Sequence, residues 1–211
     1  MTKLTPEDLM EQNNYELLAE VEHPKIKQFI LNQINPGINL IRWFSNYQIV
    51  MMLLFVFLVV KAVILVTRGM NEALWQMGYA LLFSFTVLIF LHEMIHALAY
   101  LSCGVRHLKA GVVWRKFIFY VMADRQVMDS RSFRMVAYAP FILVKGCCLI
   151  LGIVFWSASY AYFFFGVMCI HSLFCAGDIA MVAFYDLHAG KEIFNFDDCD
   201  QGKTFFYYRR S

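Results

Sequence analysis

The chain has 211 residues, of which 60% are hydrophobic and 16% charged, and its formal net charge is +2. Soluble domains are usually about 45–50% apolar and about 25% charged. This composition excludes a disordered chain, a disulfide scaffold and a nucleic-acid-binding domain, and it favours a polytopic membrane protein. The six cysteines show no zinc-knuckle spacing, and most lie in apolar runs, so we expect reduced packing residues.

Residues 1–47 are expected to form an amphipathic helical cap in the cytoplasm or at the interface. The tetrapeptide TPED at residues 5–8 is typical of a helix start, because a hydroxyl caps the helix and proline fits its first position. Ile26, Phe29 and Ile30 then recur at helical spacing. The acidic start is unlike a cleavable signal peptide, which has a basic and then an apolar stretch.

Four apolar segments follow, over about residues 48–66, 75–102, 135–156 and 160–184. Each is long enough to cross a hydrocarbon core of about 30 Å as a helix. Short turns join the first two segments and the last two, which predicts two helical hairpins connected by a longer joining segment. We therefore expect an all-α polytopic fold with about four transmembrane helices over residues 48–186 and a cytoplasmic tail over residues 187–211.

The placement of lysine and arginine predicts the orientation in the membrane. If the N-terminus is cytoplasmic, every lysine and arginine falls on that side except Lys61, Arg68 and Lys145. Lys61 and Lys145 lie within apolar segments, and only Arg68 reaches the opposite side. The pattern predicts a multi-pass protein with both ends inside, and the absence of a signal peptide fits the cytoplasmic membrane of a bacterium.

The joining segment contains a short β-hairpin-like stretch after the second span. Residues 109–121 are rich in β-branched and aromatic side chains, and the charged pair Arg115-Lys116 in their middle suits a turn. An amphipathic interfacial helix is the alternative, because short apolar runs are ambiguous. The acidic stretch 197–200 indicates a solvated tail.

The second apolar segment carries the pattern HExxH at His92, Glu93 and His96. Two histidines four residues apart on a helix project from one face and can bind one metal ion, for which zinc suits the ligands. Glu93 is placed to take a proton from a zinc-activated water and to deliver it to a leaving amine. Ionisable groups in an apolar span are functional by default, and a hydrogen-bonded histidine pair that ties helices together is the structural alternative.

Asp178 in the last span is the candidate third zinc ligand, because its expected depth in the membrane matches that of the two histidines. An ion pair with Lys145 of the third span is another possible role. His171 precedes Asp178 by two helical turns. It could polarise a substrate carbonyl, orient a ligand, or replace Asp178 as a ligand.

The stretch from His92 to Ala99 resembles the zinc helix of intramembrane metalloproteases of the site-2 protease type. The arrangement over residues 75–186 is similar to small multi-pass membrane proteins catalogued as putative zincin peptidases. These share an HExxH span, a β-prone segment with glycine, an Ala-Pro pair that opens the next span and a Gly-Asp pair in the last one: here residues 104–121, Ala139-Pro140 and Gly177-Asp178.

The resemblance implies an integral-membrane zinc metallopeptidase that hydrolyses peptide bonds of membrane-associated proteins. A non-proteolytic metal-binding membrane protein, such as a maturation factor, chaperone or transporter subunit, is the alternative, and a proton-coupled transporter is a third. The expected partners are a membrane-protein or membrane-associated peptide substrate and the lipid bilayer, with no nucleic acid. The strand-like segment 109–120 could hold an unwound substrate by β-addition, so a proline at Val113 is expected to reduce cleavage.

Overall fold

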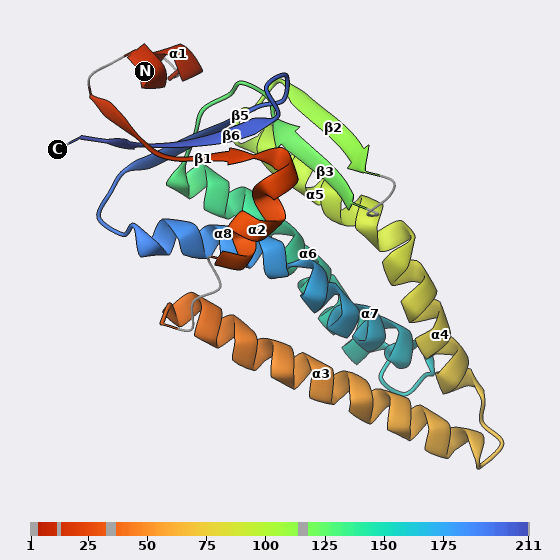
Figure 1. Ribbon diagram of the computed structural model, residues 1–211. Coiled ribbons are helices and arrows are strands. Elements are labelled where there is room, and N and C mark those ends of the chain that lie inside the picture. The colour runs from red at the N-terminus through yellow and green to blue at the C-terminus, as the bar shows by residue number, and fades with distance from the viewer. Residues whose placement is uncertain (1–3, 12–13, 33–36, 114–117, 211) are drawn as a thin grey trace.

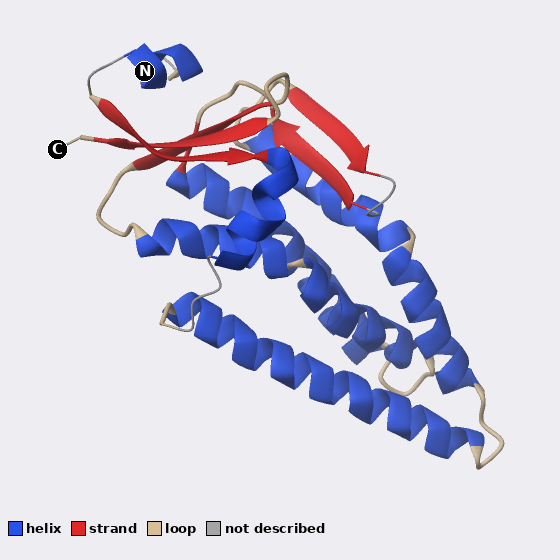
Figure 2. Cartoon of the chain, in the orientation of Figure 1, coloured by secondary structure: helices blue, strands red, loops and turns tan. Residues whose placement is uncertain are grey.

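The computed structural model describes residues 4–11, 14–32, 37–113 and 118–210. A bundle of helices carries β-strands at one end, and both ends of the chain lie beside those strands (Figure 1). The strands come from the joining segment and from both ends of the chain, and they gather at this end of the bundle (Figure 2). The fold is mostly helical, but the expectation of an all-α class is wrong because of this β-structure.

Within the described ranges, the bundle consists of helices α3 to α8. Their bounds are α3 (Asn39–Val66), α4 (Glu72–Phe85), α5 (Val87–Ser102), α6 (Ser130–Val154), α7 (Tyr160–Phe174) and α8 (Ala176–Leu187). α3 and α6 are each long and apolar enough to cross a membrane, whereas the α4–α5 and α7–α8 pairs meet that condition together and bend by 48° and 45°. The described chain thus offers two candidate spans, or up to four if each bent pair is one span.

The break between α4 and α5 lies at Thr86, where neither proline nor glycine is present. The Thr86 hydroxyl donates a hydrogen bond of 2.6 Å to the Leu82 carbonyl, and such back-bonding to the carbonyl four residues earlier tends to bend a helix. Beyond the break, α5 packs against α6 and β3, and it buries His92 and His96. The bend therefore begins the part of the chain in which the candidate ligands lie.

Close packing between the helices depends on small residues. A Cβ atom at Gly152 of α6 would lie 2.7 Å from the ring of Phe165 of α7. A Cβ atom at Gly166 of α7 would lie 3.0 Å from the Cβ atom of Ala80 of α4. Small residues at such positions let helix backbones approach closely inside a membrane bundle.

The main sheet is antiparallel and has the strand order β1-β6-β5-β4. Its strands are β1 (Tyr15–Glu22), β4 (Met128–Asp129), β5 (Ile193–Asp198) and β6 (Lys203–Arg209). Two short helices of the expected N-terminal cap do form, α1 (Pro6–Glu11) and α2 (Ile26–Asn32). Residues 15–22 are a strand rather than a helix, and in the acidic stretch 197–200, which was expected to be a solvated tail, Asp197 and Asp198 are buried at the end of β5, so both of these predictions are wrong.

The alternation of side chains explains why the C-terminal strands are buried on both faces. The face toward α1 packs around Leu9 and is aromatic: Phe194, Phe196, Phe205 and Tyr207. On the opposite face, Ile193 and Phe206 pack against Phe184 and Tyr185 of α8. The acidic residues among these aromatic ones resemble a tail in sequence, but the aromatic side chains are covered by distant parts of the chain, which include α1, β1, α2 and α8.

The joining segment forms a separate antiparallel hairpin of β2 (Leu108–Val113) and β3 (Ile118–Ala123). This confirms the predicted strands, and the alternative of an interfacial helix is wrong; the predicted turn at Arg115-Lys116 lies outside the described residues. β3 packs against α5, and a parallel bridge from Asp124 to Asp197 connects the hairpin to the main sheet. β3 is therefore the strand that lies beside the HExxH helix.

Candidate metal centre

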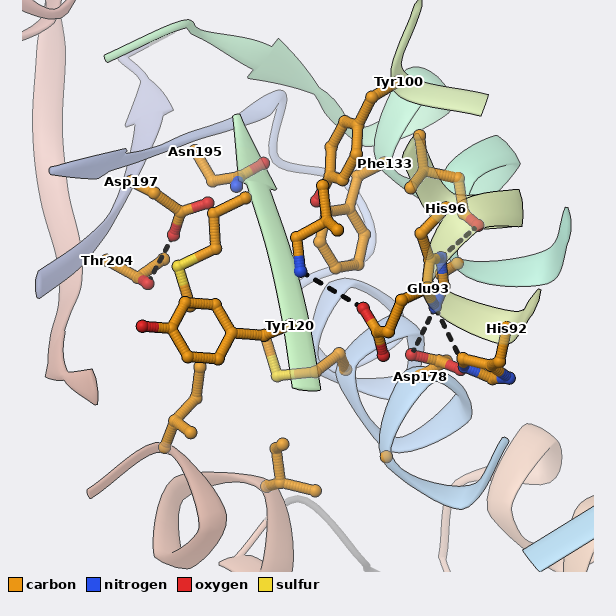
Figure 3. A pocket seen from close by; sticks show the side chains of 18 of the residues that line it. His92, Glu93, His96, Tyr100, Tyr120, Phe133, Asp178, Asn195, Asp197 and Thr204 are labelled. Carbon is orange, nitrogen blue, oxygen red and sulfur yellow. Dashed lines mark hydrogen bonds and ion pairs between the residues drawn. The ribbon is translucent and has the colours of Figure 1, made fainter. Parts of the chain in front are cut away.

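The two histidines of the HExxH pattern and the carboxylate of Asp178 meet inside the bundle (Figure 3). His92 and His96 lie one turn apart on α5, and Asp178 lies in the first turn of α8. Their ligand atoms all fall within 4.8 Å of one another. The Nε2 atoms of His92 and His96 lie 3.3 and 3.4 Å from the two Asp178 carboxylate oxygens and 3.1 Å from each other.

These residues fit a metal ion. The Nδ1 atom of His96 lies 3.1 Å from the Val136 carbonyl, which can only accept, so Nδ1 carries the proton and the neutral ring presents a lone pair at Nε2. The buried oxygen Oδ2 of Asp178 makes no hydrogen bond within the described chain. Lone pairs that face one another in a buried site need a cation between them, and two imidazoles with a carboxylate suit zinc.

The carbonyl that orients His96 is available because of a proline. In an α-helix the Val136 carbonyl would accept from the N–H four residues later, but that residue is Pro140, which has no N–H. The Ala-Pro pair at the start of the predicted third span thus has a structural role, because Pro140 leaves the Val136 carbonyl available to His96. Sequence reasoning noted the pair but did not connect it with His96.

Glu93 lies beside the three candidate ligands and contacts the hairpin. The backbone N–H of Val121 in β3 donates a hydrogen bond of 3.1 Å to Oε2 of Glu93. No described group makes a hydrogen bond to Oε1, the other oxygen. The contact holds the carboxylate between the histidine face of α5 and the edge of β3 (Figure 3).

His171 lies behind His92. Its Nε2 atom is 3.0 Å from Nδ1 of His92, on the side of the ring opposite to Asp178. His171 also contacts the Cys175 thiol at 3.6 Å, so that His92, His171 and Cys175 form a second group whose ligand atoms lie within 4.8 Å. The two groups use different nitrogens of His92.

Lys145 does not pair with Asp178, so that alternative is wrong. The ammonium group of Lys145 donates to the Met168 carbonyl and lies 5.5 Å from the ring centre of Tyr47. The Asp178 carboxylate lies beside the imidazole rings of His92 and His96 instead.

A cavity of about 350 Å³ opens at the centre and extends to the main sheet. Its lining includes the three candidate ligands and Glu93 at one end. At the other end, three polar side chains come from the face of the main sheet that is turned toward the bundle: Asn195, Asp197 and Thr204 (Figure 3). Sequence reasoning missed these residues, although their alternation with Phe194 and Phe196 was visible.

Comparison with known proteins gives one match. A family model described as "Putative zincin peptidase" matches residues 85–191, just over half of the chain. The matched region contains all the candidate site residues from His92 to Asp178, and it ends before β5 and β6. No curated protein and no solved structure matches the chain significantly.

Proposed function

The chain belongs to the family described as putative zincin peptidases, whose cofactor is zinc, and from this premise we propose that it is an integral-membrane zinc metallopeptidase of the site-2 protease type. The observation that carries the proposal is the meeting of Asp178 with His92 and His96 beside Glu93. Two helices that are separate in sequence supply the parts of one hydrolytic site.

His92, His96 and Asp178 would hold the zinc ion. When bound, zinc polarises a peptide carbonyl and lowers the pKa of a water molecule toward about 7. His171 fits an orienting role better than a ligand role, because it contacts the nitrogen of His92 that points away from Asp178. The hydrogen bond from His96 to Val136 fixes the second ring in the same way.

Glu93 is the general base and acid of the proposed reaction. Its carboxylate takes the proton from the attacking water and delivers it to the amine that leaves when the peptide bond breaks. The Val121 N–H holds one carboxylate oxygen, so that the other can carry the proton without rotation of the side chain. The group is therefore held in place before a substrate arrives.

The proposal places α3, α6 and the two bent pairs in a membrane. Large apolar side chains are exposed along all of these helices, including Leu53, Leu82, Ile150 and Leu173. Both chain ends and the strands lie at the same end of the bundle (Figure 1), which is also where most lysines and arginines lie in the predicted topology. We propose that this end is cytoplasmic, that residues 48–186 form the transmembrane domain between residues 1–47 and the tail 187–211, and that the host membrane is a bacterial cytoplasmic membrane.

The proposed substrate is a membrane protein or a membrane-associated peptide that pairs with β3. A helical substrate hides its carbonyls, so a stretch must unwind, and an added strand satisfies its backbone groups. Val121 of β3 faces Glu93, whereas Val113 lies in β2 and pairs with Ile118. A proline at Val113 would therefore disrupt the pairing of β2 with β3 before it affected the binding of a substrate strand. A substitution in β3 is the more direct test of the strand edge that lies beside Glu93.

Metal analysis combined with a cleavage assay tests the proposal. Wild-type protein is expected to bind about one zinc ion per chain, His92→Ala to lose it, and Glu93→Gln to retain zinc while cleavage of an unwound membrane peptide is lost. Retained cleavage in Glu93→Gln would contradict a peptidase role. Zinc binding without any cleavage in wild type would favour the non-proteolytic alternative.

A further inference from the structure

Three polar side chains at the sheet end of the cavity are almost fully buried. Asp197 is 8% exposed, Asn195 4% and Thr204 3%. The face of a strand that is turned toward a helical bundle normally carries apolar side chains, and Ile193 and Phe206 on the same face follow that rule. Three buried polar side chains beside a cavity therefore require an explanation.

Asp197 is also an acidic group of this corner that forms no ion pair within the described residues. The neighbouring acids each pair with a lysine or an arginine: Asp124 and Asp200 with Lys109, and Glu7 and Asp198 with Arg125. Among the residues that the structure describes, no lysine, arginine or histidine nitrogen lies within 4.0 Å of the Asp197 carboxylate. Within the described chain, the Thr204 hydroxyl donates a hydrogen bond of 2.6 Å to this carboxylate.

A buried carboxylate with a single neutral hydrogen bond is costly. Burial raises the pKa of Asp197 above its usual value, and the Thr204 hydrogen bond and a charge on His23 act in the opposite direction. The amide of Asn195 adds a further oxygen and nitrogen, and the Tyr185 hydroxyl donates to that oxygen at 2.9 Å. A cation that enters the cavity would contact a carboxylate, a hydroxyl and an amide, all of them on buried side chains.

We propose that Asp197, with Asn195 and Thr204, forms a subsite for a positively charged group of the peptide substrate. The chemistry is that of an ammonium or guanidinium group, supplied by a lysine or arginine side chain or by the free amino end of the peptide. This inference rests on the proposed peptidase function, because the subsite shares one cavity with Glu93 and the candidate zinc ligands. It names the substrate class as peptides with a cationic group near the cleaved bond.

The proposed topology gives such peptides a source. Segments that flank a membrane span on the cytoplasmic side are enriched in lysine and arginine, and the main sheet lies at the end of the bundle assigned to that side. A span that unwinds at β3 would bring its flanking basic residues toward the main sheet. The subsite would thus select the cytoplasmic border of a membrane-protein substrate.

Peptide binding to zinc-loaded Glu93→Gln protein tests the subsite without requiring cleavage. The probes are three fluorescent alanine–leucine hexapeptides that differ in one feature: an acetylated peptide with a central lysine, its norleucine counterpart, and the norleucine peptide with a free amino end. Fluorescence anisotropy gives the affinities. We expect at least one cationic peptide to bind about tenfold more tightly than the neutral one, and which of the two does so identifies the source of the charge.

The preference is expected to disappear in Asp197→Asn, which keeps an acceptor for Thr204, and to persist in Asp200→Asn, a neighbouring acid that does not line the cavity. Equal binding of all three peptides, no binding of any, or a preference that survives Asp197→Asn would overturn the inference. The zinc content and the cleavage by wild type are measured separately, so a failed peptidase proposal remains distinguishable from a failed subsite.

Discussion

The continuous helices and the bent helix pairs of this bundle contribute differently to the candidate site. α3 runs without a break over Asn39–Val66 and carries no candidate site residue. The α4–α5 and α7–α8 pairs bend by 48° and 45°, and every candidate ligand lies on one of them. α6 is continuous, but its internal Pro140 leaves a carbonyl available to His96.

The difference shows how an apolar bundle can accommodate ionisable groups. Polar side chains in a span are tolerated where they meet one another or a protein interior rather than lipid. A bend, or a proline inside a helix, changes the direction of a segment or exposes a backbone group, so that polar partners from separate spans can meet. The continuous α3 carries no candidate site residue, and it contributes apolar packing surface to the bundle.

The largest effect is expected from removing the candidate ligand on the second bent pair. Asp178→Ala should lower the zinc affinity by more than about 100-fold, since even the loss of an outer partner of a zinc ligand costs about 10–100-fold. Asp186→Ala is the matched control, because Asp186 lies on the same helix and pairs with Arg134 at 2.7 Å. Titration against a chromophoric chelator measures both. Unchanged affinity in Asp178→Ala would remove α8 from the site and leave His171 of α7 as the candidate third ligand.

The contact between α6 and α7 should respond next most strongly. Gly152→Ala is expected to destabilise the protein by about 1–3 kcal/mol, because the new methyl group overlaps the Phe165 ring. Gly146→Ala on the same helix has open space around the added atom and is expected to be neutral or slightly stabilising. Thermal unfolding in detergent compares the two. Equal stability would show that the helices can separate at Gly152 without cost.

Removing the proline of α6 should weaken the site while it strengthens the helix. In Pro140→Ala the new N–H competes with His96 for the Val136 carbonyl, so the zinc affinity should fall about tenfold. The helix itself gains a hydrogen bond and loses a proline penalty of about 3 kcal/mol, although neighbouring groups reduce that gain. Pro24→Ala, outside the bundle, is the control. A loss of stability together with unchanged zinc affinity would contradict the orienting role.

The sequence predicted the parts of this arrangement that depend on local pattern. Apolar length identified the helices, and the spacing of His92 and His96 with the matching depth of Asp178 identified residues that the structure brings together. The bend at Thr86 has no proline or glycine to mark it. The main sheet was missed because β1 and β6 are almost a whole chain apart, and no local window contains both strands.

The smallest effect should come from the outer face of the continuous helix. Leu53 of α3 is 61% exposed and Leu58 is 7% exposed. If lipid surrounds α3, Leu53→Ala should change the stability by less than about 0.5 kcal/mol, because the side chain has the same apolar surroundings before and after the helices assemble. Leu58→Ala opens a cavity in the bundle and serves as the positive control, at about 2–5 kcal/mol. A loss above about 1 kcal/mol at Leu53 would mean that this face of α3 packs against protein rather than lipid. The continuous α3 would then be a binding surface for a partner protein as well as packing surface for the bundle.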